Sequence, residues 1–172
     1  MISPDAARQA ARYAVEVATY GQTLKYKAAW DELTASVCSK AVRLCLKRSG
    51  AISQLQFTQL DTMTTDHFDV FIRLTDPIVG SADQMRLVPQ GSILGFIEEN
   101  PPNRVLIHAM VATGHGLAAG NKNSCLGFGN DFGWEILDLA NNLHWVAGDG
   151  RVNVAPSPHQ RLIRVQYRRL PL

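Results

Sequence analysis

The feature that most constrains the fold is a change in the spacing of apolar residues along the chain. In the first fifty residues they recur at helical spacing, whereas from Pro89 onward they form short runs and alternating segments separated by glycine and asparagine turns. Helices followed by a mainly antiparallel sheet are typical of an α+β domain. The 172 residues fit one such domain, spanning residues 1–172.

Two N-terminal helices are expected. Apolar positions at helical spacing cover residues 4–20, with Ser3 as the N-cap and Gly21 directly after the last residue. A second set covers residues 36–48, with Ser36 as the expected N-cap and Gly50 just beyond the helix. The polar, aromatic-bearing stretch between the two sets is interpreted as a connection.

The remainder of the chain predicts strands joined by tight turns. The segment from residue 54 to 86 is ambiguous apart from one alternating stretch within it. The patterns predict strands over residues 68–74, 93–97, 105–112, 117–119 and 162–167, a turn at 114–116, an irregular loop over 121–133 and a short helix over 134–143.

Composition and charge exclude several classes of protein. With 46% hydrophobic and 19% charged residues the chain can bury a core, which excludes an intrinsically disordered chain. A net charge of +2 argues against a nucleic-acid or polybasic membrane binder, and no apolar run reaches the roughly 18–20 residues of a membrane span. Charged residues interrupt the apolar pattern of residues 1–18, so we expect no signal peptide. We therefore expect either a cytoplasmic location or export by a specialised system that does not use a signal peptide. Three cysteines do not make a disulfide framework, and we expect no metal or other cofactor.

Cys38 is the first candidate for chemistry because it falls in the first turn of the second predicted helix. Unpaired N–H groups and the dipole at a helix N-terminus favour a thiolate, which attacks carbonyl groups far better than a thiol does. The alternative is a small buried hydrophobic residue, the commoner role of a cysteine on a helix face. Cys45, two turns later, is assigned to the core.

His108 lies within an apolar strand run, where an aliphatic residue would be expected. It is therefore either a hydrogen-bonded structural residue or the general base that a cysteine nucleophile requires. His115 stands between two glycines in a turn, where exposure is expected.

Three segments support the catalytic interpretation of both residues: Val-Cys-Ser-Lys-Ala-Val-Arg-Leu at 37–44, Pro-Gln-Gly-Ser-Ile-Leu-Gly-Phe at 89–96 and His-Ala-Met-Val-Ala-Thr-Gly-His-Gly at 108–116. Their order resembles the papain-like cysteine hydrolases, including the NlpC/P60 group of peptidoglycan hydrolases. The resemblance covers residues 36–123. It implies a papain-like fold, Cys38 as the nucleophile, His108 as the base and a hairpin turn at Gly114 and Gly116.

The surroundings of the cysteine differ from those of the cell-wall enzymes. Val37 precedes Cys38 and Ser39-Lys40 follow it, where those enzymes usually have aspartate and serine-glycine, and Ser92 replaces an aspartate. The chain therefore resembles more closely the papain-like bacterial effectors and toxins that cleave or deamidate proteins. This implies hydrolysis of an amide bond in a protein or peptide through a thioester and, for a toxin, an immunity or inhibitor protein as a partner.

The resemblance also implies a third polar residue that orients the imidazole. Asn121 and Asn123 follow the hairpin closely enough for either side chain to reach His108, and Asp131 is a further alternative. A turn asparagine that only tolerates a left-handed backbone is the structural alternative for both.

An oxyanion donor besides the backbone N–H of Cys38 is implied upstream of the nucleophile. Gln22, Tyr26 and Trp30 are the candidates, and the sequence leaves the choice among them open.

Rival interpretations remain. The glycines at 114–120 could suggest a dinucleotide-binding turn, but no helix pattern follows them. A zinc site lacks paired ligand spacing, and Cys125 as nucleophile lacks a helix N-terminus. A peptidoglycan amidase of NlpC/P60 type is the enzymatic alternative. The non-enzymatic alternative is a catalytically inactive binding module on the same scaffold, with the basic C-terminal strand as its contact surface.

Overall fold

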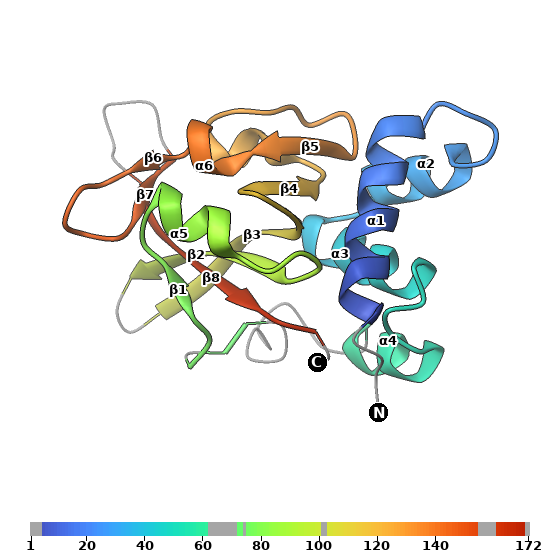
Figure 1. The fold of residues 1–172 in the computed structure, drawn as a ribbon, viewed down its shortest axis with the longest axis horizontal. Coiled ribbons are helices and arrows are strands. Elements are labelled where there is room, and N and C mark those ends of the chain that lie inside the picture. The colour runs from blue at the N-terminus through green and yellow to red at the C-terminus, as the bar shows by residue number, and fades with distance from the viewer. Residues whose placement is uncertain (1–4, 62–71, 74, 101–102, 155–160, 171–172) are drawn as a thin grey trace.

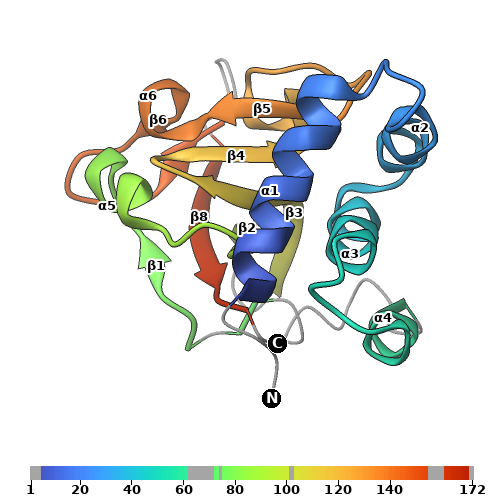
Figure 2. The same ribbon diagram turned by 45° about the vertical axis from the view of Figure 1, so that its right-hand side comes forward.

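The computed structural model describes residues 5–61, 72–73, 75–100, 103–154 and 161–170. The helical part consists of α1 (Asp5–Tyr20), α2 (Lys27–Ala35), α3 (Cys38–Arg48) and α4 (Gln54–Asp61). Figure 2 shows α1 in front of the sheet, and α2, α3 and α4 one below the other at the right-hand side of the molecule. Both α1 and α3 contact the strands directly, and α4 packs on α3.

Every strand pairing among the described residues is antiparallel, which confirms the mainly antiparallel sheet that the sequence predicts. The sheet is curled, and its strands follow the order β5-β4-β3-β2-β8-β7-β6, with β1 also paired to β8 (Figure 1). The strands are β1 (Ile78–Val79), β2 (Ile93–Asn100), β3 (Asn103–Gly114), β4 (Leu117–Gly120), β5 (Glu135–Asp138), β6 (His144–Trp145), β7 (Val152–Asn153) and β8 (Leu162–Arg168). Two short helices, α5 (Ala82–Leu87) and α6 (Leu139–Asn142), and the 3₁₀ helix η2 (Asn123–Leu126) complete the described elements.

Alternation along the strands divides the core into two clusters, one on each face of the sheet. In β3, Ala109 and Val111 face the cluster that contains α1 and α3, whereas Met110 faces the second cluster under α5, α6 and η2. Small residues at helical spacing let α1 lie close to the sheet, namely Ala6, Ala10, Ala14 and Val17. Cys45 is fully buried in the first cluster, as predicted.

Glycines allow close approaches where the two parts of the domain meet. A Cβ on Gly21 would lie 2.0 Å from Cδ1 of Trp30, so only glycine at this position lets Trp30 lie against the end of α1. A Cβ on Gly91 would lie 2.0 Å from the carbonyl oxygen of Ala7, and Gly91 also has a φ of +79°. The turn before β2 can therefore contact the backbone of α1 only with glycine at this position.

Several expectations need correction. Residues 27–35 form α2 rather than a connection, and α3 begins at Cys38 with Val37 as its N-cap, so Ser36 does not cap it. Instead, the Ser36 hydroxyl donates to the carbonyl oxygen of Glu32 at the end of α2. Residues 135–138 form β5, and only residues 139–142 of the expected C-terminal helix are helical, because the segment pairs with β4.

Other expectations are confirmed. The first helix ends at Tyr20, and Gly50 follows α3 with a left-handed φ of +77°. The turn at 114–116 joins β3 to β4, with positive φ angles at all three residues. The N-cap expected at Ser3 and most of the strand expected over 68–74 lie outside the described residues.

Candidate active site

Cys38 is the first residue of α3 and is half-buried. Val37 before it is extended, with φ −65° and ψ 152°, and no side chain caps the helix. Its carbonyl oxygen already accepts the first helical hydrogen bond, from Ala41 N at 2.9 Å. The N–H groups of the first turn are therefore left to interact with the cysteine sulfur or with a bound group.

Asn121 fixes the connection that carries Cys38. Its side-chain Nδ2 donates to the carbonyl oxygens of Leu33 and Ser36, each at 2.6 Å. Asn121 is fully buried, and it follows β4 directly. The start of α3 is therefore tied to the end of β4, beside β3.

The register of the sheet explains what the sulfur contacts. The N–H and the carbonyl of Ala112 both form hydrogen bonds with the β2 side of the strand. Successive residues of a strand form their backbone hydrogen bonds on alternate sides, so the N–H of Ala109, three residues earlier, points to the other neighbour, β4. The pairing of β3 with β4 ends at Val111–Ala119, which leaves Ala109 N–H without a strand partner on that side. This N–H donates to the sulfur of Cys38 instead. The thiol thus lies at the edge of β3, against the backbone of the residue that follows His108.

Burial raises the pKa of the Cys38 thiol above its ordinary value of 9.0. The backbone N–H groups of Ala109, Ser39 and Cys38 itself and the positive charge of Lys122 act in the opposite direction. The sequence predicts a lowered pKa from the helix N-terminus alone. The stabilising N–H groups are present, but the loss of solvent outweighs them, so Cys38 is a neutral thiol at rest.

His108 is 1% exposed and lies on the face of β3 opposite Ala109, with its ring 5.7 Å from that of Phe96. Burial lowers its pKa to about 4, and a hydrogen bond with Asn123 opposes this shift. The imidazole is therefore neutral at pH 7 and retains an acceptor nitrogen.

Asn123 determines which nitrogen of His108 is the acceptor. Its Oδ1 lies 2.9 Å from Nε2 of His108, and its Nδ2 donates to Gly120 O and Glu135 Oε1, both at 3.0 Å. Because Nδ2 already faces two acceptors, Oδ1 must face the ring, and Nε2 must carry the hydrogen. The lone pair of the neutral ring is then on Nδ1.

Asn123 and Asn121, which the sequence leaves as alternatives, thus have different partners: Asn123 contacts the imidazole, and Asn121 holds the backbone before Cys38. Asp131 accepts a hydrogen bond from the Ser124 hydroxyl. Between Cys38 and His108 themselves there is no hydrogen bond in the described structure; they are linked through Ala109 N–H, the residue after the histidine.

The expected oxyanion donors lie on or near α2. The hydroxyl of buried Tyr26 donates to Glu16 on α1 at 2.6 Å, and Gln22 is exposed on the loop between α1 and α2. Trp30 packs against Gly21 and Gly133. Lys122, which the sequence analysis did not single out, is the cation that acts on Cys38; its φ of 53° is unusual for a non-glycine residue.

Cys125 lies in η2, two residues after Asn123, and burial raises its pKa to about 12, with a smaller contribution from its electrostatic interaction with the Cys38 thiol group. Its thiol is therefore less acidic than an ordinary cysteine. Only Cys38 of the two combines a helix N-terminus with an N–H from the sheet.

Other surfaces are separate from these residues. A hollow of about 650 Å³ lies beside α1, lined by residues such as Arg8, Arg12, Gln90 and Thr113, and none of the candidate residues lines it. Within the described part of the chain, no cluster of three or more His, Cys, Asp and Glu side chains is arranged to hold a metal ion. None of the described helices has the length and apolar character needed to cross a membrane.

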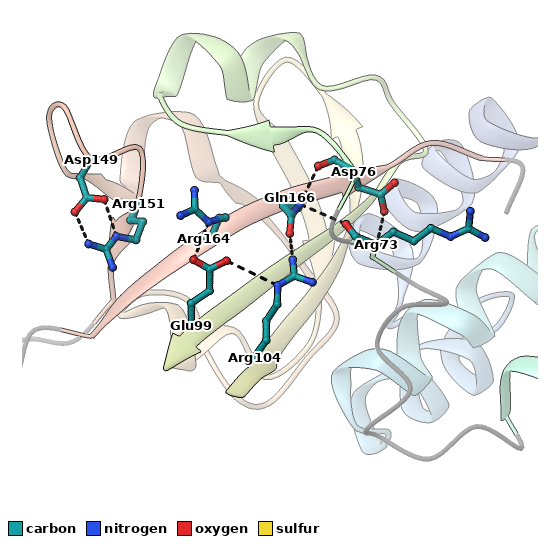
Figure 3. A network of polar contacts seen from close by, with 8 residues as sticks. All are labelled: Arg73, Asp76, Glu99, Arg104, Asp149, Arg151, Arg164 and Gln166. Atoms are coloured by element: carbon teal, nitrogen blue, oxygen red, sulfur yellow. Dashed lines mark hydrogen bonds and ion pairs between the residues drawn. The ribbon is translucent and has the colours of Figure 1, made fainter. Parts of the chain in front are cut away.

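The basic C-terminal strand is paired with acidic residues of β2. Arg161 contacts Glu98 through two nitrogens at 3.1 and 2.8 Å, and Arg164 Nε lies 2.9 Å from Glu99. Figure 3 shows Glu99 between Arg164 and Arg104, with Gln166 bonded to the backbone of Asp76. Much of the positive charge of this strand is therefore balanced within the protein.

No protein-family model matches the chain, and no curated protein matches it.

Proposed function

We propose that the protein is a papain-like cysteine hydrolase that acts on an amide bond of a protein or peptide, with Cys38 as nucleophile, His108 as base and Asn123 as the residue that orients the imidazole. The observation that carries this proposal is the 2.9 Å contact between His108 Nε2 and Asn123 Oδ1 beside a helix N-terminal cysteine. The contact supports the proposal because it leaves the Nδ1 lone pair of His108 available to accept a proton.

The reaction follows from the protonation states. The Cys38 thiol gives its proton to Nδ1 of His108 as the sulfur bonds to the substrate carbonyl carbon. Backbone N–H groups of Cys38 and Ser39 stabilise the oxyanion. The C–N bond then breaks, Nδ1 returns its proton to the leaving nitrogen, and a thioester remains. Water attacks the thioester with Nδ1 again taking the proton, the C–S bond breaks to release the acid, and Nδ1 returns the proton to the sulfur, which regenerates the thiol.

The resting pair in this scheme is neutral rather than ionised. A base with a pKa of about 4 is unprotonated at neutral pH, but it accepts a proton only when substrate raises its basicity or brings the sulfur close. Catalytic hydrogen bonds often form fully only in the substrate complex. We therefore propose that substrate binding closes the distance between the Cys38 sulfur and Nδ1.

Peptide cleavage and glutamine deamidation share every step above and differ only in whether the leaving group is a peptide amine or ammonia. We propose a bacterial effector or toxin as the setting, with an immunity or inhibitor protein as partner in the second case. An inactive binding module is the second candidate, because the raised pKa of Cys38 and the lack of a direct bond to His108 also fit a protein that does not turn over.

The experiment compares the unmodified protein with Cys38→Ala and Cys125→Ala on peptides, glutamine-rich proteins and peptidoglycan fragments, reading new amino termini by mass spectrometry and ammonia by an enzymatic assay. The proposal predicts turnover that Cys38→Ala abolishes and Cys125→Ala retains. Turnover that survives in Cys38→Ala contradicts the proposal. If the unmodified protein and Cys38→Ala both bind a partner and neither shows turnover, the binding module is favoured.

A further inference from the structure

We propose that Glu135 is a positioning residue that sets the direction of the Asn123 side-chain amide and thereby the tautomer of His108. The catalytic value of this arrangement rests on the proposed function, whereas the arrangement itself does not. Glu135 is the first residue of β5 and pairs with Gly120, the last residue of β4. It is therefore held on the sheet beside the segment that carries Asn123.

The carboxylate of Glu135 closes a ring of hydrogen bonds around Asn123. Its Oε1 accepts from Asn123 Nδ2 at 3.0 Å and from the backbone N of Asn130 at 2.7 Å, and its Oε2 accepts from Asn130 Nδ2 at 2.7 Å. The carbonyl oxygen of Asn130 in turn accepts from the backbone N of Asn123 at 2.9 Å. Both the main chain and the side chain of Asn123 are thus tied to the same carboxylate.

The chemistry of the carboxylate explains why it controls orientation. The two ends of an asparagine amide have nearly the same shape, and only their hydrogen-bonding character distinguishes them. A carboxylate accepts hydrogen bonds and cannot donate them, so a flipped Asn123 would place Oδ1 against both Glu135 Oε1 and Gly120 O. The flipped form leaves buried polar atoms unpaired, which disfavours it.

Glycines make room for this arrangement. A Cβ on Gly129 would lie 2.8 Å from Cβ of Asn123 and 2.9 Å from Oε1 of Glu135, and Gly129 has a φ of +81°. A Cβ on Gly120 would lie 3.1 Å from Oδ1 of Asn123. The chain is therefore closely packed on both sides of the Asn123 side chain.

A purely structural role for Glu135, holding the loop before β5, makes a different prediction from a positioning role. Replacing the carboxylate by an amide of the same shape affects the loop in either case. Only the positioning role predicts a change at the imidazole, because the glutamine can turn its NH₂ toward Asn123 and allow Asn123 to present its own NH₂ to His108. The ring would then respond with the other tautomer.

The test is ¹⁵N NMR of the His108 side chain in the full chain at pH 7, which distinguishes the two neutral tautomers without substrate. We expect the unmodified protein to hold the hydrogen on Nε2, and Glu135→Gln to lower that population measurably, since only the carbonyl oxygen of Gly120 then opposes the flipped amide of Asn123. Asp131→Asn, a charge removal in the same loop, should leave the tautomer unchanged. A folded Glu135→Gln that keeps the Nε2–H tautomer completely overturns the proposal.

A second variant covers the case in which Glu135→Gln does not fold. In the double variant N123D/E135Q the acceptor and donor exchange places, so the carboxylate at position 123 faces His108 and the amide at position 135 donates to it. His108 should then carry a hydrogen on Nε2 in every molecule, because a carboxylate at position 123 presents only acceptors to the ring, even where it also raises the pKa of the imidazole. A folded double variant with mixed tautomers contradicts the proposal, and because no turnover is measured, neither result depends on whether the protein is a hydrolase.

Discussion

His108 Nε2 lies 2.9 Å from Oδ1 of Asn123, and both side chains are almost completely buried between β3 and η2. A buried imidazole without a counter-charge stays neutral, so this contact is a hydrogen bond from the ring to an amide rather than an ion pair. The pair therefore links the chemistry of the site to the stability of the fold, and both can be measured.

The first prediction concerns stability in acid. His108 has a pKa of about 4 in the folded protein and the ordinary value of 6.5 when unfolded, so the unfolded chain binds the extra proton between these values. The free energy of unfolding should be unaffected by this group above pH 6.5 and fall by about 3 kcal/mol as the pH drops to about 4. Urea unfolding at a series of pH values measures it.

His108→Gln should remove this part of the pH dependence whatever its effect at pH 7. His144→Gln, at an exposed position, is the matched control and should keep it. An equal slope between pH 6.5 and 4 in the unmodified protein and in His108→Gln would show that the buried histidine is already protonated or becomes solvated.

The second prediction separates the two asparagines. Asn121→Ala leaves the carbonyl oxygens of Leu33 and Ser36 without their donor and should lower the free energy of unfolding by about 2–4 kcal/mol. The NMR tautomer of His108 should not change in this variant. Asn123→Ala should instead disturb the tautomer, because the partner of Nε2 is lost. A changed tautomer in Asn121→Ala, together with an unchanged tautomer in Asn123→Ala, would contradict the assigned roles.

These two asparagines show which part of the site the sequence alone can predict. Spacing after His108 favours Asn121 or Asn123 as the third residue, with Asp131 as a further alternative, because both asparagines follow the hairpin that the glycines at 114 and 116 predict. The choice depends on which side chain faces β3 and which faces the end of α2, and that orientation is fixed by contacts far apart in sequence. A local pattern does not contain it.

The same limit applies to the fold. The apolar spacing of α1 and α3 and the alternation of β3 and β8 are strong, and those elements are found within a few residues of their predicted bounds. The helix α2 buries only Ala29 and Leu33, a signal too weak to separate from a loop. Residues 135–138 form a strand only because β4 offers its edge to them. The pKa of Cys38 likewise depends on burial by the sheet, which outweighs the helix terminus that the sequence reveals.

The third prediction concerns the turn before β2. Gly91→Ala should destabilise the protein by about 2 kcal/mol or more, because the new Cβ meets the backbone of Ala7 and the residue has a positive φ. Gly148→Ala is a suitable control: φ is +77° there as well, but a Cβ meets no atom within 4 Å. Equal losses in the two variants, measured by thermal unfolding, would mean that the φ angle alone matters and that α1 does not lie against this turn.

The fourth prediction concerns Lys122. Its charge lowers the pKa of the Cys38 thiol, so Lys122→Gln should slow the alkylation of Cys38 by iodoacetamide at pH 8 by about threefold, whereas Lys122→Arg keeps the charge and the rate. Mass spectrometry of digests assigns the modified cysteine. Cys125, with a pKa of about 12, should react more slowly than Cys38 in every form. An unchanged rate in Lys122→Gln would place the ammonium too far from the sulfur to act on it.

The central claim is that Cys38 is acylated with the help of His108, and a chromogenic ester tests it without knowledge of the natural substrate. After brief reaction with p-nitrophenyl acetate and acid quenching, peptide mass spectrometry should find an acetyl thioester on Cys38 that disappears with time as water releases it. His108→Ala should slow its formation by about a hundredfold, the low end of the effect of a general base. Acetylation of Cys38 at the same rate in His108→Ala, or equally on Cys125, would contradict the assignment of a catalytic pair.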